Sequence, residues 1–201
     1  NAKILYYRGL NYTALAERID DNEIDRSPAK TRAQKASYDF TLAIQIDSSK
    51  AEYFSGRGKL LYNYDNFEKA LADFETSVKR EPNSHIDYGY LGMTKCYLRK
   101  GGIRELDKAI EIYPSYAESY YNLAKYMEGN NMPDGAFGNY ELAIERDPSN
   151  GKYYTARGIL YFRMEKYELA LAEFNQAIAK DKTYGMAYFN RAMLYKAVPE
   201  L

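Results

Sequence analysis

The chain has 201 residues, with 28 acidic and 28 basic side chains and a single cysteine, Cys96. The balanced charge gives no electrostatic basis for binding nucleic acid or an anionic membrane, and one cysteine excludes an intrachain disulfide framework. Because no apolar run reaches the ~18 residues of a transmembrane helix, we also expect no direct membrane insertion.

The first predicted helix runs from Ala2 to about Arg18. An acidic segment, DDNEIDRS at 20–27, then interrupts the helical pattern. Ser27 is a good N-cap and Pro28 a good first helical residue, so the second helix is predicted from Pro28 to about Ile46.

Pairs of short amphipathic helices recur along the chain at a nearly constant spacing of 34 residues. The first helix of each pair carries a small residue on its apolar stripe, and the second carries a large one. The small residues are Gly58, Gly92, Ala124, Gly158 and Ala192, and the large ones are Phe40, Phe74, Leu106, Tyr140 and Phe174. Proline follows the second helix at 82, 114 and 148, where it ends the helix. We therefore expect the small residues to let paired backbones approach while the large rings fill the space beside them.

One predicted unit departs from this spacing. Residues 85–116 are two residues shorter than the other units, and Gly101-Gly102 stands where the inter-helix turn is expected. Two glycines favour a turn and weaken the start of the second helix, so we expect local distortion there.

A repeated 34-residue helix–turn–helix unit with these residues at these offsets resembles the tetratricopeptide repeat family. The resemblance implies an all-α fold, a right-handed superhelical solenoid of antiparallel helix pairs. It would form one domain over 1–201, with units near 2–50 (including the insertion), 51–84, 85–116, 117–150 and 151–184, and a terminal helix over 185–197.

The resemblance also implies a non-catalytic scaffold that binds a protein or an extended peptide in a concave groove lined by the first helices. The residues expected to face that groove are Tyr62, Asn63, Tyr90, Met93, Tyr97, Tyr121, Asn122, Lys125, Lys152, Phe162, Phe189 and Asn190. Aromatic residues and methionine are enriched where proteins meet, and asparagine amides suit the backbone of an extended peptide.

Some family members hold the C-terminal carboxylate of chaperone tails in a clamp of lysine, asparagine and arginine. Asn122 and Lys152 match two of its positions, whereas Gly89, Met93 and Ala156 stand at others. We therefore predict no such clamp.

Groups suited to catalysis are scarce. His85 and Cys96, the only histidine and the only cysteine, do not make a zinc site. His85 is typical of a surface or capping residue, and Cys96 of a small buried hydrophobe. The acids of 20–25 lack the glycine and terminal glutamate of a calcium loop, which favours a solvated loop. We predict no enzymatic activity, no cofactor and no metal site.

An arginine precedes the small residue of four first helices, at Arg8, Arg57, Arg157 and Arg191. We expect their stems to pack between units and their heads to reach solvent or a carbonyl. We favour this structural role over the alternative that the four arginines together bind an acidic ligand.

Two alternative functions remain open. Instead of a groove-binding scaffold, the chain could be a structural module that self-associates through its terminal helices, or a partner-binding appendage of a larger protein. A cytoplasmic location and, after removal of a signal peptide, a periplasmic or secreted one are both compatible with the sequence.

Overall fold

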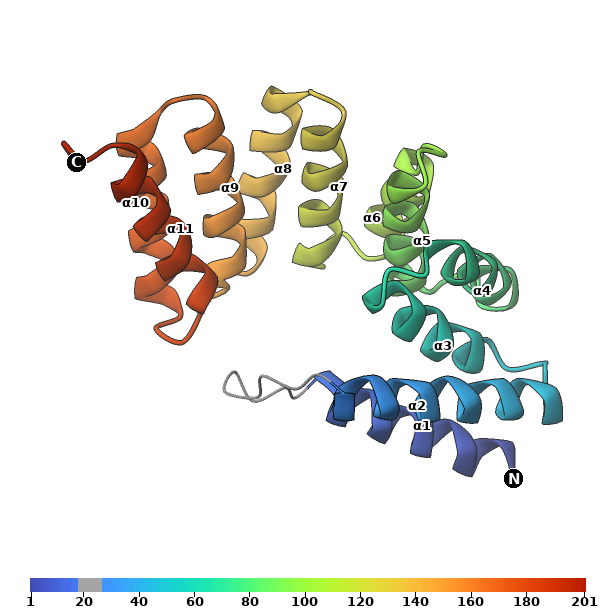
Figure 1. The fold of residues 1–201 in the computed structure, drawn as a ribbon. Coiled ribbons are helices and arrows are strands. Elements are labelled where there is room, and N and C mark those ends of the chain that lie inside the picture. The colour runs from blue at the N-terminus through green and yellow to red at the C-terminus, as the bar shows by residue number, and fades with distance from the viewer. Residues whose placement is uncertain (18–26) are drawn as a thin grey trace. The chain divides into compact units, whose positions relative to one another are not determined.

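The structure is a computed structural model that describes residues 1–17 and 27–201 (Figure 1). The acidic cluster of 20–25 lies outside the described residues. The described residues form α-helices and no strand. In chain order the helices are α1 (Ala2–Glu17), α2 (Ser27–Ile46), α3 (Ala51–Asn63), α4 (Phe67–Arg80), α5 (His85–Tyr97), α6 (Ile103–Ile112), α7 (Ala117–Gly129), α8 (Pro133–Arg146), α9 (Gly151–Arg163), α10 (Tyr167–Lys180) and α11 (Gly185–Ala197).

The helices group into two compact units, which we call the N-terminal unit (Asn1–Ile112) and the C-terminal unit (Tyr113–Leu201). In the N-terminal unit α1 pairs with α2, α3 with α4, and α5 with α6. In the C-terminal unit α7 pairs with α8 and α9 with α10, and α11 packs on both α9 and α10. The predicted all-α solenoid class, built from consecutive helix pairs, is confirmed.

Each pair is held by a large residue of the second helix that packs against a small residue of the first. Phe74 has no exposed surface and Phe174 only 1%. A Cβ added at Gly158 would lie 2.7 Å from Cε1 of Phe174, so the backbone of α9 touches the ring directly. Fully burying one such side chain stabilises the fold by about 1.5–3 kcal/mol.

The turn inside four of the pairs has the same backbone geometry. One residue in each adopts a positive φ near 60°: Asp65, Arg99, Asn131 and Glu165. Beside it, a backbone N–H bonds the carbonyl five residues earlier, as from Asn66 to Leu61 at 2.8 Å and from Lys166 to Tyr161 at 3.0 Å. This Schellman-type bond closes the first helix and directs the second back along it.

The pair α5–α6 contains the predicted irregularity. Gly101 and Gly102 adopt φ values of 83° and 123°, and a Cβ at Gly102 would collide with the carbonyl oxygen of Gly92. The following helix α6 has 10 residues, against 14 in α4, α8 and α10. Gly102 thus allows a close backbone approach to α5 that a side chain would block, and it directly precedes the shorter second helix.

The arginines of the first helices correct one sequence-based expectation. Three of the four heads do not end at a carbonyl but bond the carboxylate that immediately precedes the large residue of the second helix. The pairs are Arg8–Asp39 at 2.6 Å, Arg57–Asp73 at 2.7 Å and Arg157–Glu173 at 2.8 Å. The fourth, Arg191, bonds the amide oxygen of Asn175 at 2.7 Å. An arginine followed by a small residue is therefore matched by an acid followed by a large one.

Candidate partner-binding surface

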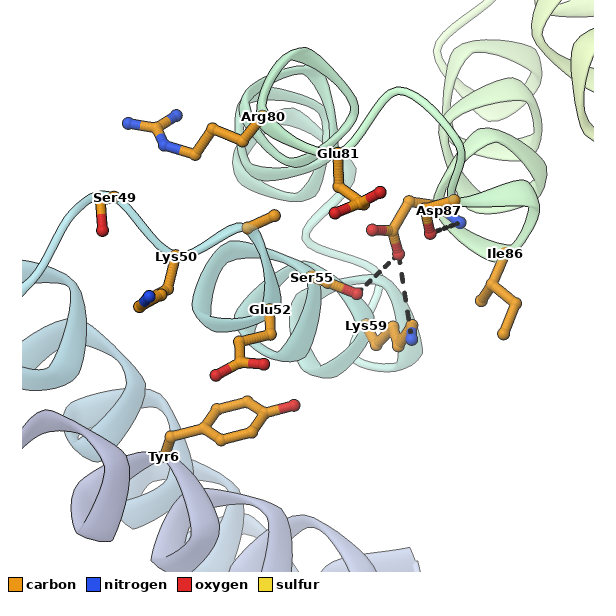
Figure 2. Close-up of a pocket in the computed structure, with 12 residues that line it drawn as sticks. Tyr6, Ser49, Lys50, Glu52, Ser55, Lys59, Arg80, Glu81, Ile86 and Asp87 are labelled. Carbon is orange, nitrogen blue, oxygen red and sulfur yellow. Dashed lines mark hydrogen bonds and ion pairs between the residues drawn. The ribbon is translucent and has the colours of Figure 1, made fainter.

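The N-terminal unit contains a pocket of about 480 Å³ beside its first helices (Figure 2). Tyr6 reaches it from α1, Ser55 and Lys59 from α3, and Ile86 and Asp87 from α5. Residues of three successive first helices thus line the pocket, together with Arg80 and Glu81 at the end of α4. None of the twelve residues predicted to face a groove lines it.

Asp87 forms the rigid floor of this pocket. Its carboxylate is 4% exposed and accepts hydrogen bonds from the hydroxyls of Ser55 and Ser77, each at 2.6 Å. Its own backbone N–H donates to Oγ of Ser84 at 3.3 Å, which caps α5. Because Ser55 lies on α3, Ser77 on α4 and Asp87 on α5, these bonds hold three helices together.

Lys59 places a positive charge at the rim of the pocket. Nζ of Lys59 lies 3.9 Å from the Asp87 carboxylate and 5.7 Å from the centre of the Tyr90 ring, with 36% of its side chain exposed. Across the pocket, burial and the neighbouring Glu52 raise the pKa of the Tyr6 phenol, so the phenol keeps its proton and can donate a hydrogen bond.

Three predicted residues meet in one aromatic cluster next to the pocket. The Tyr62 ring lies 5.2 Å from Tyr90 and 5.9 Å from Tyr97, and Tyr97 stacks on Phe67 at 4.6 Å. Tyr97 is nevertheless 54% exposed. The cluster therefore offers a partner a firmly supported ring surface.

The other predicted residues of this unit have different surroundings. Met93 is 7% exposed and belongs to the core. Asn63 is exposed, and its amide donates to Oε1 of Glu17 at 2.8 Å. Of the two, only Asn63 is presented to solvent.

In the C-terminal unit, the predicted residues Tyr121 and Lys152 lie against each other. Nζ of Lys152 lies 4.1 Å from the centre of the Tyr121 ring and 2.7 Å from the Glu118 carboxylate. Glu118 also accepts a 3.2 Å hydrogen bond from the phenol of Tyr153, whose pKa is raised by burial and by this carboxylate. Lysine, ring and carboxylate together join α7 to α9.

A second carboxylate organises the far end of α7. The Glu128 side chain is 5% exposed and accepts from Nζ of Lys125 at 3.2 Å, from the phenol of Tyr140 at 2.6 Å and from Arg163. Burial and the neighbouring Glu128 raise the pKa of Tyr140. Lys125 and Lys152, both predicted to face a partner, thus already have carboxylate partners.

The remaining predicted residues divide by accessibility. Asn122 is half-buried on α7, and its amide makes no hydrogen bond to the described residues. Phe162 is half-buried and packs against the core beside Tyr167, at 5.8 Å between ring centres. Phe189 is 59% exposed, and the Asn190 amide donates to the Met186 carbonyl of its own helix at 2.7 Å. Asn122 and Phe189 are therefore the two best placed to contact a partner.

The acids Asp87, Glu118 and Glu128 were not predicted as site residues. One signal was present in the sequence, since Glu118 and Lys152 have opposite charges at positions 34 residues apart. Residues at equivalent places in successive repeats are neighbours, so a charge reversal there indicates an ion pair between adjacent first helices.

Among the residues that the structure describes, no group of three or more His, Cys, Asp or Glu side chains is placed to hold a metal ion. Burial lowers the pKa of His85, and Cys96 is half-buried rather than fully buried. None of the helices in 1–17 and 27–201 has the length and hydropathy needed to cross a membrane.

Comparison with known proteins identifies the repeat. Sequence models described as Tetratricopeptide repeat match residues 105–137 and 151–183. Human mitochondrial import receptor subunit TOM70 is 24% identical over 164 residues, covering 76% of this chain and 27% of that protein. Human tetratricopeptide repeat protein 13 is 25% identical over 186 residues, covering 86% of this chain and 21% of that protein. The UDP-N-acetylglucosamine–peptide N-acetylglucosaminyltransferase of Giardia intestinalis is 32% identical over 126 residues, covering 62% of this chain and 8% of that protein. The chain spans less than a third of the length of these relatives.

Solved structures show the same fold. The tetratricopeptide repeat protein TTC0263 of Thermus thermophilus has a TM-score of 0.76 at 17% identity, covering 94% of this chain and 99% of that one. YrrB, a repeat protein described as having an unusual peptide-binding site, has a TM-score of 0.59 at 19% identity, covering 92% of each chain. The sequence models thus identify tetratricopeptide repeats in residues 105–137 and 151–183, and the solved structures show that the same fold extends over most of the chain.

Proposed function

We propose that this chain is a non-catalytic scaffold that binds an extended segment of a partner protein along its first helices. Each unit has its own first-helix surface. In the N-terminal unit it comprises the pocket of Figure 2 and the Tyr62–Tyr90–Tyr97 cluster, and in the C-terminal unit the exposed parts of Tyr121, Asn122, Lys125 and Lys152. The observation that carries the proposal is a pocket of about 480 Å³ next to a ring cluster in which Tyr97 is exposed and stacks on Phe67.

The chemistry of the surface describes the expected ligand. The pocket has room for a side chain between Tyr6 and Asp87, and the rings beside it offer apolar contact area at low entropic cost. In the C-terminal unit the Asn122 amide suits a backbone peptide group of an extended ligand.

Charge makes a smaller contribution to recognition. Lys125 and Lys152 lie 3.2 and 2.7 Å from Glu128 and Glu118, so a ligand carboxylate must compete with these acids. We therefore expect the affinity to depend more on rings and amides than on ligand charge, and to change little with salt.

Two of the related proteins support a binding role. TOM70 is named an import receptor, and YrrB is described by its peptide-binding site. Both names concern those proteins, and the partner of the present chain is to be identified by experiment.

The test is a selection of displayed peptides on the immobilised chain, followed by titration of the selected peptide in solution. One variant removes four solvent-accessible side chains of the first helices in both units: Lys59→Ala, Tyr97→Ala, Asn122→Ala and Lys152→Ala. A matched control removes four exposed residues of second helices: Glu75→Ala, Lys79→Ala, Glu141→Ala and Glu145→Ala.

We expect the first variant to lose binding and the control to retain it, with both keeping the helical circular dichroism of the parent. Equal affinity of parent and first variant would refute the assignment. Binding lost only in the control would place recognition on the second helices.

A further inference from the structure

Asp87 differs from the other buried aspartates in its lack of a hydrogen-bonded cation. Three aspartates of the described residues are buried, namely Asp39, Asp73 and Asp87. Asp39 accepts two hydrogen bonds from the guanidinium of Arg8, at 2.6 and 2.7 Å. Asp73 accepts two from Arg57, at 2.8 and 2.7 Å. Asp87 accepts hydrogen bonds only from serine hydroxyls in the part of the chain that the structure describes.

The Asp87 carboxylate has acceptor capacity left for a cation. A carboxylate has about four lone-pair sites, two on each oxygen. Ser55 donates to Oδ1 and Ser77 to Oδ2, so one site on each oxygen remains. Nζ of Lys59 lies 3.9 Å from Oδ1, beyond the length of about 2.7–3.2 Å of an N–H···O hydrogen bond. Because a buried charge is costly without a bonded counter-charge, a cation that reaches both oxygens would stabilise this site.

The walls of the pocket next to Asp87 add negative charge. Glu52 and Glu81 line the pocket with exposed side chains, and neither forms an ion pair with a residue that the structure describes. Burial, followed by the charges of Glu52 and Asp87 among its neighbours, raises the pKa of the Tyr6 phenol. The space between Tyr6 and Asp87 therefore has a negative potential.

Two further cations line the pocket but are turned away from Asp87. The charged ends of Lys50 and Arg80 lie on the side away from Asp87 in Figure 2. Nε of Arg80 donates to the Ser48 carbonyl at 2.8 Å, and its guanidinium packs over the Phe54 ring at 4.5 Å. Neither side chain fills the Asp87 end of the pocket, which leaves it to a cation from outside.

We propose that this pocket binds a basic side chain of the partner segment, an arginine or a lysine, whose charged end bonds the Asp87 carboxylate. The inference rests on the proposed function, since the pocket belongs to the first-helix surface of the N-terminal unit. An arginine fork can bond both oxygens of Asp87, as the chain's own arginines do at Asp39 and Asp73. A pocket of about 480 Å³ has room for such a side chain, with Tyr6 and Ile86 placed to contact its apolar stem.

The bound charge adds to the ring and amide contacts of the first-helix surface. Salt screens a partly buried ion pair much less than an exposed one. The contact therefore agrees with an affinity that changes little with salt.

The test titrates two blocked tripeptides into the full chain. The probe is acetyl-Ala-Arg-Ala-amide, and its matched control carries citrulline, which has nearly the shape of arginine but no charge. Binding is followed by NMR through the backbone amide signals of Ser55 and Asp87. The same titrations use the variants Asp87→Asn and Glu75→Gln, of which the second removes an exposed charge of α4 outside the pocket.

We expect the arginine peptide to shift both signals saturably in the parent and in Glu75→Gln. It should bind about tenfold more tightly than the citrulline peptide, because only arginine forms charge-assisted hydrogen bonds. In Asp87→Asn the two peptides should bind equally. If Asp87→Asn loses the helical circular dichroism of the parent, Glu52→Gln takes its place. That variant should weaken the arginine peptide alone, by about two- to fivefold.

Two results would overturn the inference: no saturable shift by the arginine peptide, or equal binding of the two peptides by the parent. Shifts confined to Glu118 or Glu128 would also do so, because the cation would then bind in the C-terminal unit.

The peptides selected in the test of the proposed function separate the two claims. If their affinity is unchanged when arginine is replaced by citrulline and lysine by acetyllysine, the binding role stands and the inference is wrong. If the arginine tripeptide binds at Asp87 but no peptide is selected, the cation site stands and the proposed scaffold function is wrong.

Discussion

Replacing Asp87 by asparagine tests whether the floor of the N-terminal pocket is held as described. The buried carboxylate accepts two hydroxyl bonds at 2.6 Å, from Ser55 and Ser77. Asparagine has nearly the same shape but no charge, and one serine must turn to accept from its amide. Ser77 has another acceptor in the Ala51 carbonyl at 3.2 Å, so neither hydroxyl is left without a partner.

The expected cost follows from these bonds. A hydrogen bond to a charged group contributes about 1.5–3 kcal/mol and a neutral one about 0.5–1.5 kcal/mol, so losing the charge at two bonds should cost about 2–3 kcal/mol. The partly exposed Lys59 at 3.9 Å adds less than about 1 kcal/mol.

The measurement is urea unfolding followed by circular dichroism. Glu81→Gln serves as the control, because Glu81 is exposed at the same pocket and its change should stay within about 0.5 kcal/mol. A free energy of unfolding for Asp87→Asn within about 0.5 kcal/mol of the parent would refute the role assigned to this carboxylate.

Three further predictions concern the repeats. Nε of Arg157 and Oε2 of Glu173 are buried without a hydrogen-bond partner. Glu173→Asp, which allows the two-bond pairing seen at Arg57, should therefore raise the free energy of unfolding by about 1 kcal/mol. A lower free energy of unfolding, measured by urea denaturation, would contradict this. Gly102→Ala places a side chain at a positive φ and against a carbonyl of α5, so it should lower the free energy of unfolding by about 3 kcal/mol. A thermal midpoint equal to that of the parent would show the reasoning to be wrong. Thr183 donates two hydrogen bonds to the Asp181 carboxylate, one from its hydroxyl and one from its backbone N–H. Both lower the carboxyl pKa of Asp181 below the ordinary 3.8, the hydroxyl more than the N–H. The stabilisation is therefore present above about pH 4 and lost as the pH falls through the folded pKa; NMR titration should show the Asp181 pKa rising toward 3.8 in Thr183→Ala, and an unchanged value would refute the assignment.

The repeat architecture could be predicted from the sequence because its determinants recur at a constant spacing. Gly58 and Phe74, or Gly158 and Phe174, lie within one helix pair, and the turn between them is short. A local pattern repeated along the chain therefore specified the helices and their pairing, and its break at Gly101-Gly102 indicated the irregular pair α5–α6.

The surface was less predictable because it depends on neighbouring helices. A groove position was inferred from its place in the repeat, yet Met93 is buried and Phe162 is half-buried against the core. Asp87 became recognisable only when Ser55 of α3 and Ser77 of α4 were seen to meet at one carboxylate. Partners on different helices follow from three-dimensional packing, which no single-helix pattern contains.

The most direct test of the central claim is to locate a selected peptide by photo-crosslinking. A photoreactive amino acid is placed at position 59 or 122 on first helices, and at position 75 or 141 on second helices, all in otherwise unchanged chains. Covalent adducts with the peptide from positions 59 or 122, and none from 75 or 141, are the result that a binding first-helix surface predicts. Adducts from 75 or 141, with none from 59 and 122, would contradict it.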